Sequence, residues 1–225
     1  MEEIVQSILQ NFFNLAIIER VWPYLLKGLG TTVALALFVI PIGMMGGLIV
    51  AVLWSLNKRW LRALLIVYVD FFRAFPPLVL LLFIYYGLPF LGIQIPAIAA
   101  VALGFLLNNS SYYGEIFRAG IESIPRGQWE AARSTGLSWP KTMVHVILPQ
   151  ATRNVLPDLI SNTMEVVKLT TLASVVAIPE LLNAARNAQA LTYNATPIVL
   201  AALMYLVLLW PIVRVISRLE HRAFA

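Results

Sequence analysis

The sequence contains no cysteine, so disulfide bonds, thiolate metal sites and cysteine nucleophiles are excluded. It also has few charges: 12% of its 225 residues are charged, whereas a soluble domain carries about a quarter. With 60% hydrophobic residues, such a chain cannot cover itself with a hydrated surface. Lipid is therefore the predicted solvent, and we expect an integral membrane protein.

Motifs for catalysis and energy conversion are absent as well. The sequence has no Walker-type phosphate loop, no histidine and glutamate spacing typical of metal ligands, and no serine, histidine and aspartate set. His145 and His221 stand alone and are interpreted as interfacial side chains rather than ligands. We therefore expect no enzymatic activity, and no metal or cofactor held by this chain itself. The acidic start Met1-Glu2-Glu3 is unlike a signal peptide, so we expect no cleavable signal.

Five hydrophobic segments predict five transmembrane helices. An α-helix needs about 20 residues to cross a hydrocarbon core of roughly 30 Å, and charge-poor segments of that length recur. A β-barrel would alternate polar and apolar residues, which the run from Leu78 to Ile84 does not. The segments are approximately Gly28–Trp54, Leu64–Leu88, Ile95–Phe117, Leu156–Ile178 and Pro197–Ile216.

The remaining N-terminal residues complete the expected fold. Residues 1–25 form an amphipathic stretch, with Ile4, Ile8, Phe12 and Leu15 at helical spacing. Such a stretch is predicted to lie along the membrane surface as an interfacial helix. The expected fold is all-α, with a single transmembrane domain covering residues 1–225.

The basic residues predict how the helices are oriented. Eleven of the 16 lysines and arginines follow the first span, separate the third span from the fourth, or lie at the C-terminal end. The opposite side carries only Arg20, Lys27 and Arg186. Because cytoplasmic loops hold the excess of lysine and arginine, the N-terminus is predicted outside and the C-terminus in the cytoplasm. The polar segment 118–153 is then cytoplasmic.

A short helix is predicted within this polar segment. Ser123 suits the N-cap, Pro125 the first turn, and Gly136 the left-handed position after the last turn. Ala131 and Ala132 are small enough to let another surface approach closely. This helix either lies on the inner membrane face or is presented to a partner, and the sequence pattern alone leaves both interpretations open.

The segment from Glu130 to Pro149 resembles the cytoplasmic signature loop of bacterial ABC importer permeases. In this chain the pattern reads Glu130-Ala131-Ala132, Gly136, Val146 and Leu148-Pro149, with valine where isoleucine is usual. Three further segments resemble elements of polar amino acid permeases, namely Arg73 to Pro77, Tyr112 to Ile121, and Lys168 to Leu172 followed by Pro179-Glu180-Leu181. The similarity extends from about Gly28 to Arg222. Leu169 stands where aspartate is frequent, which bears on substrate or gate chemistry.

This resemblance implies a type I ABC importer permease in the bacterial inner membrane, a transport subunit for polar amino acids. Its loop would be a coupling helix that docks on a pair of cytoplasmic ATPase subunits, which would hold ATP and magnesium. The implied coupling residues are Trp129, Glu130, Ala131, Ala132, Arg133 and Gly136. A substrate-binding protein would deliver the amino acid to the outer loops. The pathway would need a dimer, formed with a second copy or with a similar permease.

Two charged residues lie in the fourth span. Glu165 and Lys168 are three residues apart on one helix face, and a charge at mid-bilayer costs about 2.5–3.5 kcal/mol. The two side chains must therefore pair, face a wet cavity, or both. One interpretation is a structural ion pair that seals the helix bundle. The other is that Glu165, Lys168, Thr170 and Thr171 line the translocation path.

The third span carries a run of polar residues from Asn108 to Tyr112. Amide and hydroxyl groups can bind the ammonium and carboxylate groups of an amino acid, and they can also join helices by hydrogen bonds. We favour helix–helix bonding for Asn108 and Ser111. Asn109 and Tyr112 are kept as candidates for the substrate path.

The second span contains an ion-pair candidate and a break. Asp70 and Arg73 are predicted to form a structural pair that stabilises the inner gate, and Pro76-Pro77 must break or kink the helix. The freed backbone groups then need a protein or water partner. In the first span, Gly43, Gly46 and Gly47 would allow close packing on a neighbouring helix.

Two other classes of function were weighed against the permease. A secondary amino acid transporter would work without an ATPase, but such transporters usually contain internal repeats, and none is evident in five spans. A membrane-embedded enzyme would need paired catalytic groups, which the sequence does not present.

Overall fold

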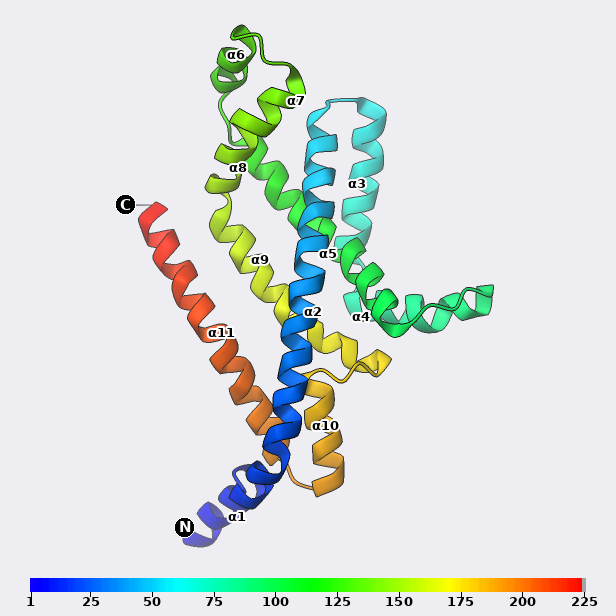
Figure 1. Ribbon diagram of the computed structural model, residues 1–225, viewed down its shortest axis with the longest axis vertical. Helices are drawn as coiled ribbons and strands as arrows, with labels where there is room; N and C mark the ends of the chain where they lie inside the picture. Colours follow the sequence, from blue (N-terminus) through cyan, green and yellow to red (C-terminus); the bar gives the residue numbers. More distant parts are fainter. Residues whose placement is uncertain (224–225) are drawn as a thin grey trace. The chain divides into compact units, whose positions relative to one another are not determined.

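A computed structural model describes the backbone of residues 1–223. The side chains of Glu2 and of residues 215–223, which include Arg218, His221 and Arg222, lie outside the described part. Every regular element among the described residues is a helix, in agreement with the predicted all-α class. The α-helices are α1 (Glu2–Phe12), α2 (Leu15–Ser55), α3 (Arg59–Ala74), α4 (Pro77–Leu82), α5 (Ala97–Glu122), α6 (Arg126–Ser134), α7 (Trp139–Thr142), α8 (Leu148–Asn154), α9 (Leu156–Leu169), α10 (Leu181–Thr192) and α11 (Thr196–Ala223) (Figure 1).

Four short helical turns of other kinds interrupt or extend these helices. The π-helical turns are η1 (Phe83–Gly87) and η3 (Met143–Ile147), and the 3₁₀ turns are η2 (Leu88–Leu91) and η4 (Thr170–Val176). The fourth predicted span is thus built from α9 and a tighter final stretch, η4. The chain leaves η4 at Ala177, whose φ of 59° is left-handed.

Each of the five predicted spans coincides with helical structure. Three segments are long and apolar enough to cross a membrane: Glu3–Ser55, Leu156–Val176 and Thr196–Arg214. The bent pair Arg59–Ala74 and Pro77–Leu91 supplies another if it counts as one span. Helix α5 has 26 residues, or about 39 Å at 1.5 Å per residue, which is long enough to cross although its polar run makes it less apolar.

The N-terminal prediction needs a correction. The separate first helix ends at Phe12, and residues 15–25, predicted to be interfacial, belong instead to the 41-residue helix α2. Asn14 explains the boundary, because its Oδ1 accepts a hydrogen bond from the backbone amide of Ile17 at 3.2 Å. This is the bond by which an N-cap residue satisfies a free amide of the first turn.

The predicted break in the second span is confirmed. Helix α3 ends at Ala74, Phe75 is extended with ψ of 125°, and the chain bends by 98° before it continues from Pro77. Proline has no backbone amide hydrogen, and its ring disfavours helical geometry in the residue before it. The two consecutive prolines therefore end α3 outright.

By backbone contacts the chain divides into two packing units. The first comprises Met1–Phe38, Leu81–Val101 and the described part of 164–225. Its core joins the start of α2 to α10 and α11 through Val21, Leu25, Leu181, Ala184, Ala185, Ala188, Ala201 and Met204. Small alanines let α10 approach α2 so closely that a Cβ at Gly28 would lie 2.9 Å from the Cβ of Ala184.

The second unit comprises Val39–Leu80 and Ala102–Thr163. Here the predicted close packing of the first span is confirmed, because the glycines of α2 lie directly against α5. A Cβ at Gly43 or Gly46 would lie 2.8 Å from the Cβ of Asn109 or Ser110. At Gly47 it would lie 2.4 Å from the Cβ of Tyr113 and 2.7 Å from the backbone nitrogen of Gly114.

The Gly47 contact generates a stability prediction. Gly47→Ala should lower the free energy of unfolding by about 1–3 kcal/mol, because the neighbouring backbone of α5 must move to admit a methyl group. Gly30→Ala in the same helix meets open space and should be neutral or stabilising by up to about 1 kcal/mol. Thermal unfolding of the two purified variants tests this, and equal midpoints would contradict it.

Candidate functional site

The polar segment 118–153 contains the predicted short helix, but the start of that helix differs from the prediction. Helix α6 begins at Arg126 with Pro125 in the N-cap position, so the prediction of Ser123 as N-cap is wrong. The Ser123 hydroxyl instead donates to the Gly120 carbonyl at 2.7 Å and accepts a hydrogen bond from Asn154 Nδ2 at 2.9 Å. Ser123 therefore closes the end of α5 and joins it to α8.

The end of α6 agrees with the prediction. Thr135 is the C-cap, and Gly136 follows with φ of 84°, a left-handed conformation that glycine adopts without strain. The Gly136 amide donates to the Arg133 carbonyl at 3.0 Å. The chain thus turns sharply away from α6 and enters α7.

Some of the predicted coupling residues are exposed on the surface of α6, and one is buried. Glu130, Ala131 and Arg133 are exposed. Ala132 is only 7% exposed and packs against the chain itself, so it does not offer the free surface that the sequence suggested. Trp129 is half-buried, and its ring lies 6.5 Å from that of Trp139 at the start of α7. The two tryptophans hold α6 against the next helix while the Glu130 side stays open.

The base of this segment is fastened to the helices on both sides. Gln150 in α8 donates to the Gln128 side chain at 3.3 Å. A Cβ at Gly120 would lie 2.9 Å from the Ala151 carbonyl oxygen, so the end of α5 and α8 are in backbone contact. The start of α6 is thus bonded to α8, and α8 in turn lies against the end of α5.

The charged residues of the fourth span form the expected pair. Lys168 Nζ donates to Glu165 Oε1, and the two side chains are 52% and 59% exposed in the single chain. Lys168 also borders a groove of about 640 Å³ against α11. The groove is lined by Lys168, Ala202, Tyr205, Leu206, Leu209, Trp210, Val213 and Arg214.

The threonines predicted beside this pair use their hydroxyls locally. Thr170 is fully buried and donates to the Val167 carbonyl, and Thr171 donates to the Lys168 carbonyl at 2.8 Å. The structure therefore brings Glu165 and Lys168 to an open surface but does not place Thr170 there.

The polar run of α5 divides into residues with different partners. Asn108 Nδ2 donates to the Phe72 carbonyl of α3 at 3.0 Å, which confirms helix–helix bonding for that residue. Ser111 donates to the Asn108 carbonyl within its own helix, so the interhelical bond predicted for it is wrong. The Tyr112 hydroxyl donates to the Arg73 carbonyl at 3.3 Å. Asn109 is buried against Gly43, and its Nδ2 has no hydrogen-bond partner among the described residues.

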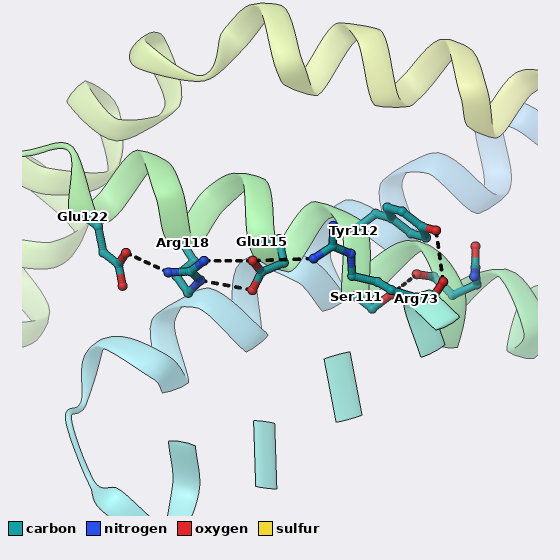
Figure 2. Close-up of polar contacts among 7 residues, drawn as sticks. Arg73, Ser111, Tyr112, Glu115, Arg118 and Glu122 are labelled. Carbon is teal, nitrogen blue, oxygen red and sulfur yellow. Dashed lines mark hydrogen bonds and ion pairs between the residues drawn. The ribbon is translucent and has the colours of Figure 1, made fainter. Parts of the chain in front are cut away.

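Arg73 does not pair with Asp70. It pairs instead with a ladder of charged side chains, Glu115, Arg118 and Glu122, that runs along α5 (Figure 2). Its Nη1 lies 3.7 Å from Glu115 Oε2, and its guanidinium stacks over the Tyr112 ring at 5.4 Å. Arg118 donates two hydrogen bonds to Glu115, at 3.0 and 2.8 Å, and a third to Glu122 at 2.7 Å. Asp70 is exposed and has no ion-pair partner in the described part of the chain, so that predicted pair is wrong.

Sequence reasoning missed Glu115 although a signal was available. Glu115, Arg118 and Glu122 stand at i, i+3 and i+7, which places all three on one helix face. The prediction weighed only charges within the same predicted span, and so it paired Arg73 with its neighbour in sequence. The actual partner comes from the next span.

A second missed residue is Glu180, which caps α10. It is fully buried, and its carboxylate accepts hydrogen bonds from the amides of Leu182 and Asn183 at 2.8 and 2.6 Å and from the Tyr205 hydroxyl at 2.9 Å. Burial raises the pKa of this carboxyl, and the hydrogen bonds from the two amides and the tyrosine oppose that effect. Glu180 thereby ties α10 to α11.

In the part of the chain that the structure describes, no three histidine, aspartate or glutamate side chains are grouped to hold a metal ion. The described site residues offer exposed surfaces and ion pairs. Their chemical resources are the exposed Glu130 side of α6 and a paired lysine at an open groove.

Comparisons with known proteins agree with this picture. The family described as "Binding-protein-dependent transport system inner membrane component" matches residues 43–224. The probable amino-acid ABC transporter permease protein YckA of Bacillus subtilis (strain 168) is 36% identical over 201 residues, or 87% of either chain. The arginine transport system permease protein ArtQ of the same organism is 32% identical over 83% of this chain and 86% of its own.

Solved structures are similar as well. A chain from the crystal structure of an amino acid ABC transporter with histidines superposes with a TM-score of 0.80 at 33% identity, covering 91% of this chain and 96% of that one. A chain of the MetNI methionine ABC transporter in an inward-facing conformation gives a TM-score of 0.74 at 20% identity, covering 88% of this chain and 95% of that one. At that identity the likeness concerns the fold.

The buried cap at Glu180 generates a second stability prediction. Glu180→Ala should lower the free energy of unfolding by about 2–4 kcal/mol, because it frees two amides of α10 and leaves the Tyr205 hydroxyl without its acceptor. Glu19→Ala removes an exposed carboxylate from α2 and should change stability by less than about 0.5 kcal/mol. Thermal or denaturant unfolding of both variants measures these changes. If Glu180→Ala lowered the free energy of unfolding no more than Glu19→Ala, the cap would not contribute to stability.

Proposed function

Because the chain belongs to the binding-protein-dependent transport system inner membrane components, with relatives that are amino acid ABC transporter permeases, we propose how it performs amino acid import. It is a multi-pass subunit of the inner membrane, and the exposed side of α6 is its contact with a cytoplasmic ATPase subunit. ATP and magnesium are held by that partner. The observation that carries this proposal is the combination of an open Glu130 surface with hydrogen bonds that join the start of α6, at Gln128, and the residue Ser123 before it to α8.

The orientation follows from the basic residues. With the N-terminus outside and the C-terminus inside, the segment containing α6 lies in the cytoplasm, where an ATPase can reach it. The opposite loops, which include α10, then face the substrate-binding protein. A charged rim at Arg186 and polar groups at Gln189 and Asn194 line a hollow of about 510 Å³ on that side, which suits a polar protein contact.

The pathway is proposed to run beside Lys168 and to require a second subunit. More than half of the surface of Lys168 and of Glu165 is exposed in the single chain, although both lie on a span. At about 2.5–3.5 kcal/mol for a charge in lipid, this surface must instead face water or another protein. A second copy of this chain, or a similar permease, satisfies that requirement and encloses the groove. The ammonium and carboxylate groups of the pair match the two charged groups of a polar amino acid.

Charge reversal at Glu130 tests the docking surface. Glu130→Arg should reduce ATPase co-purification and amino acid uptake by at least about tenfold, because a mismatched charge at an interface costs several kcal/mol. Glu19→Arg reverses an equally exposed charge on α2, outside the proposed docking surface, and should leave both intact. Co-purification and proteoliposome uptake are the measurements, and an undiminished Glu130→Arg transporter would overturn the assignment.

The role of Lys168 can be separated from that of a structural ion pair. Lys168→Met should lower uptake at limiting substrate by roughly tenfold, the effect of losing about 1.4 kcal/mol of substrate interaction. Lys58→Met, at an exposed position before α3, is the control. If the pair were only structural, adding Glu165→Gln to Lys168→Met would restore uptake by removing the unpaired charge. We expect no such rescue.

A further inference from the structure

The two prolines in the second span remove two specific hydrogen-bond donors from the end of α3. In a continuous helix the carbonyl of residue i accepts from the amide of residue i+4. The Phe72 carbonyl would accept from residue 76 and the Arg73 carbonyl from residue 77, and both of those residues are prolines. The preceding carbonyl, that of Phe71, still has its partner, because the Phe75 amide donates to it at 2.9 Å.

Helix α5 supplies a side-chain donor to each of the two freed carbonyls. Asn108 Nδ2 donates to the Phe72 carbonyl at 3.0 Å, and the Tyr112 hydroxyl donates to the Arg73 carbonyl at 3.3 Å. Asn108 and Tyr112 are four residues apart, which is one turn along the same face of α5. This spacing lets them reach two consecutive carbonyls at the end of α3. In lipid no water can replace a missing donor, so these side-chain donors satisfy carbonyls that would otherwise have no partner.

The next turn of the same face holds the Arg73 side chain. Glu115 pairs with its guanidinium at 3.7 Å, and the Tyr112 ring lies under it at 5.4 Å. Figure 2 shows Arg73, Tyr112 and Glu115 side by side, with Arg118 and Glu122 continuing the ladder along α5. Backbone and side chain of Arg73 are therefore both held by α5.

We propose that Asn108, Tyr112 and Glu115 form a clamp that holds the broken end of α3 and carries movement of the α6 loop to the bend at Pro76. Helix α5 ends at Glu122 and is fastened to the base of that loop through Ser123 and Gly120, so a displacement of the loop moves α5. The clamp passes this displacement to α3 at Phe72 and Arg73, in the last turn before the break. These three are positioning residues. The transmission step rests on the proposed function, whereas the capping of the carbonyls does not.

The capping is tested by a double-mutant cycle in the assembled transporter. Tyr112→Phe removes the donor and keeps the ring under Arg73; it should lower the unfolding midpoint by roughly 2–4 °C. In a Pro76→Ala/Pro77→Ala background, residue 77 regains an amide for the Arg73 carbonyl, and Tyr112→Phe should then leave the unfolding midpoint unchanged.

Tyr68→Phe is the matched control. It breaks a 2.6 Å hydrogen bond to Ser110 that joins the same two helices away from the break. Its cost should be equal in both backgrounds, and an equal cost of Tyr112→Phe in both would overturn the capping.

The transmission is tested by the ratio of substrate imported to ATP hydrolysed in proteoliposomes. Tyr112→Phe and Glu115→Gln should lower this ratio at least twofold while the ATPase subunits stay bound, and Tyr68→Phe should leave it unchanged. A Tyr112→Phe ratio equal to that of the native transporter would refute transmission through the clamp. Failure of the proposed function looks different, since the native assembly would then import no amino acid at all.

Discussion

Backbone groups that lie in lipid or are buried in the protein have no water to bind, and this constraint explains how two irregular points in the chain are built. Where Pro76 and Pro77 deprive α3 of donors, α5 provides an amide and a hydroxyl. Where α10 begins, the Glu180 carboxylate accepts from two of its free amides. The helix ends are therefore sites at which separate parts of one packing unit become joined.

The same constraint explains why the straight parts of the spans use small residues. Helices in lipid gain little from hydrophobic burial against one another, so close contact and polar bonds must hold them together. Gly47 lets the backbone of α2 approach that of α5 at Tyr113. In the same packing unit, the Tyr113 hydroxyl also shares a 2.8 Å hydrogen bond with Thr163. Packing and polar contacts thus reinforce each other.

Local features of this structure could be predicted from the sequence. For distant contacts the sequence indicated that Asn108 and the glycines of the first span meet another helix, but not which residues they meet. The break at Pro76, the left-handed Gly136 and the Glu165–Lys168 pair each depend on residues within four positions of one another. The partner of Arg73 did not follow from local spacing, because Glu115 lies on another helix. The start of α6 was misplaced by two residues for a related reason. Ser123 has the chemistry of an N-cap, but Asn154, 31 residues away, engages its hydroxyl.

Several polar side chains of the spans already have hydrogen-bond partners within the chain, which leaves fewer candidates for the substrate path. Tyr112 and Thr170 were both predicted to line it, yet each hydroxyl donates to a backbone carbonyl of this chain. A group engaged in that way must give up a bond before it can bind an amino acid, and the freed carbonyl would be costly in lipid. Lys168 pairs with an exposed carboxylate, and an ammonium has three donors, so it can bind a ligand while it keeps its partner. Within the fourth span, the exposed ion pair thus keeps hydrogen-bonding capacity for the substrate that we propose it meets, whereas the hydroxyls of Thr170 and Thr171 are used within the helix.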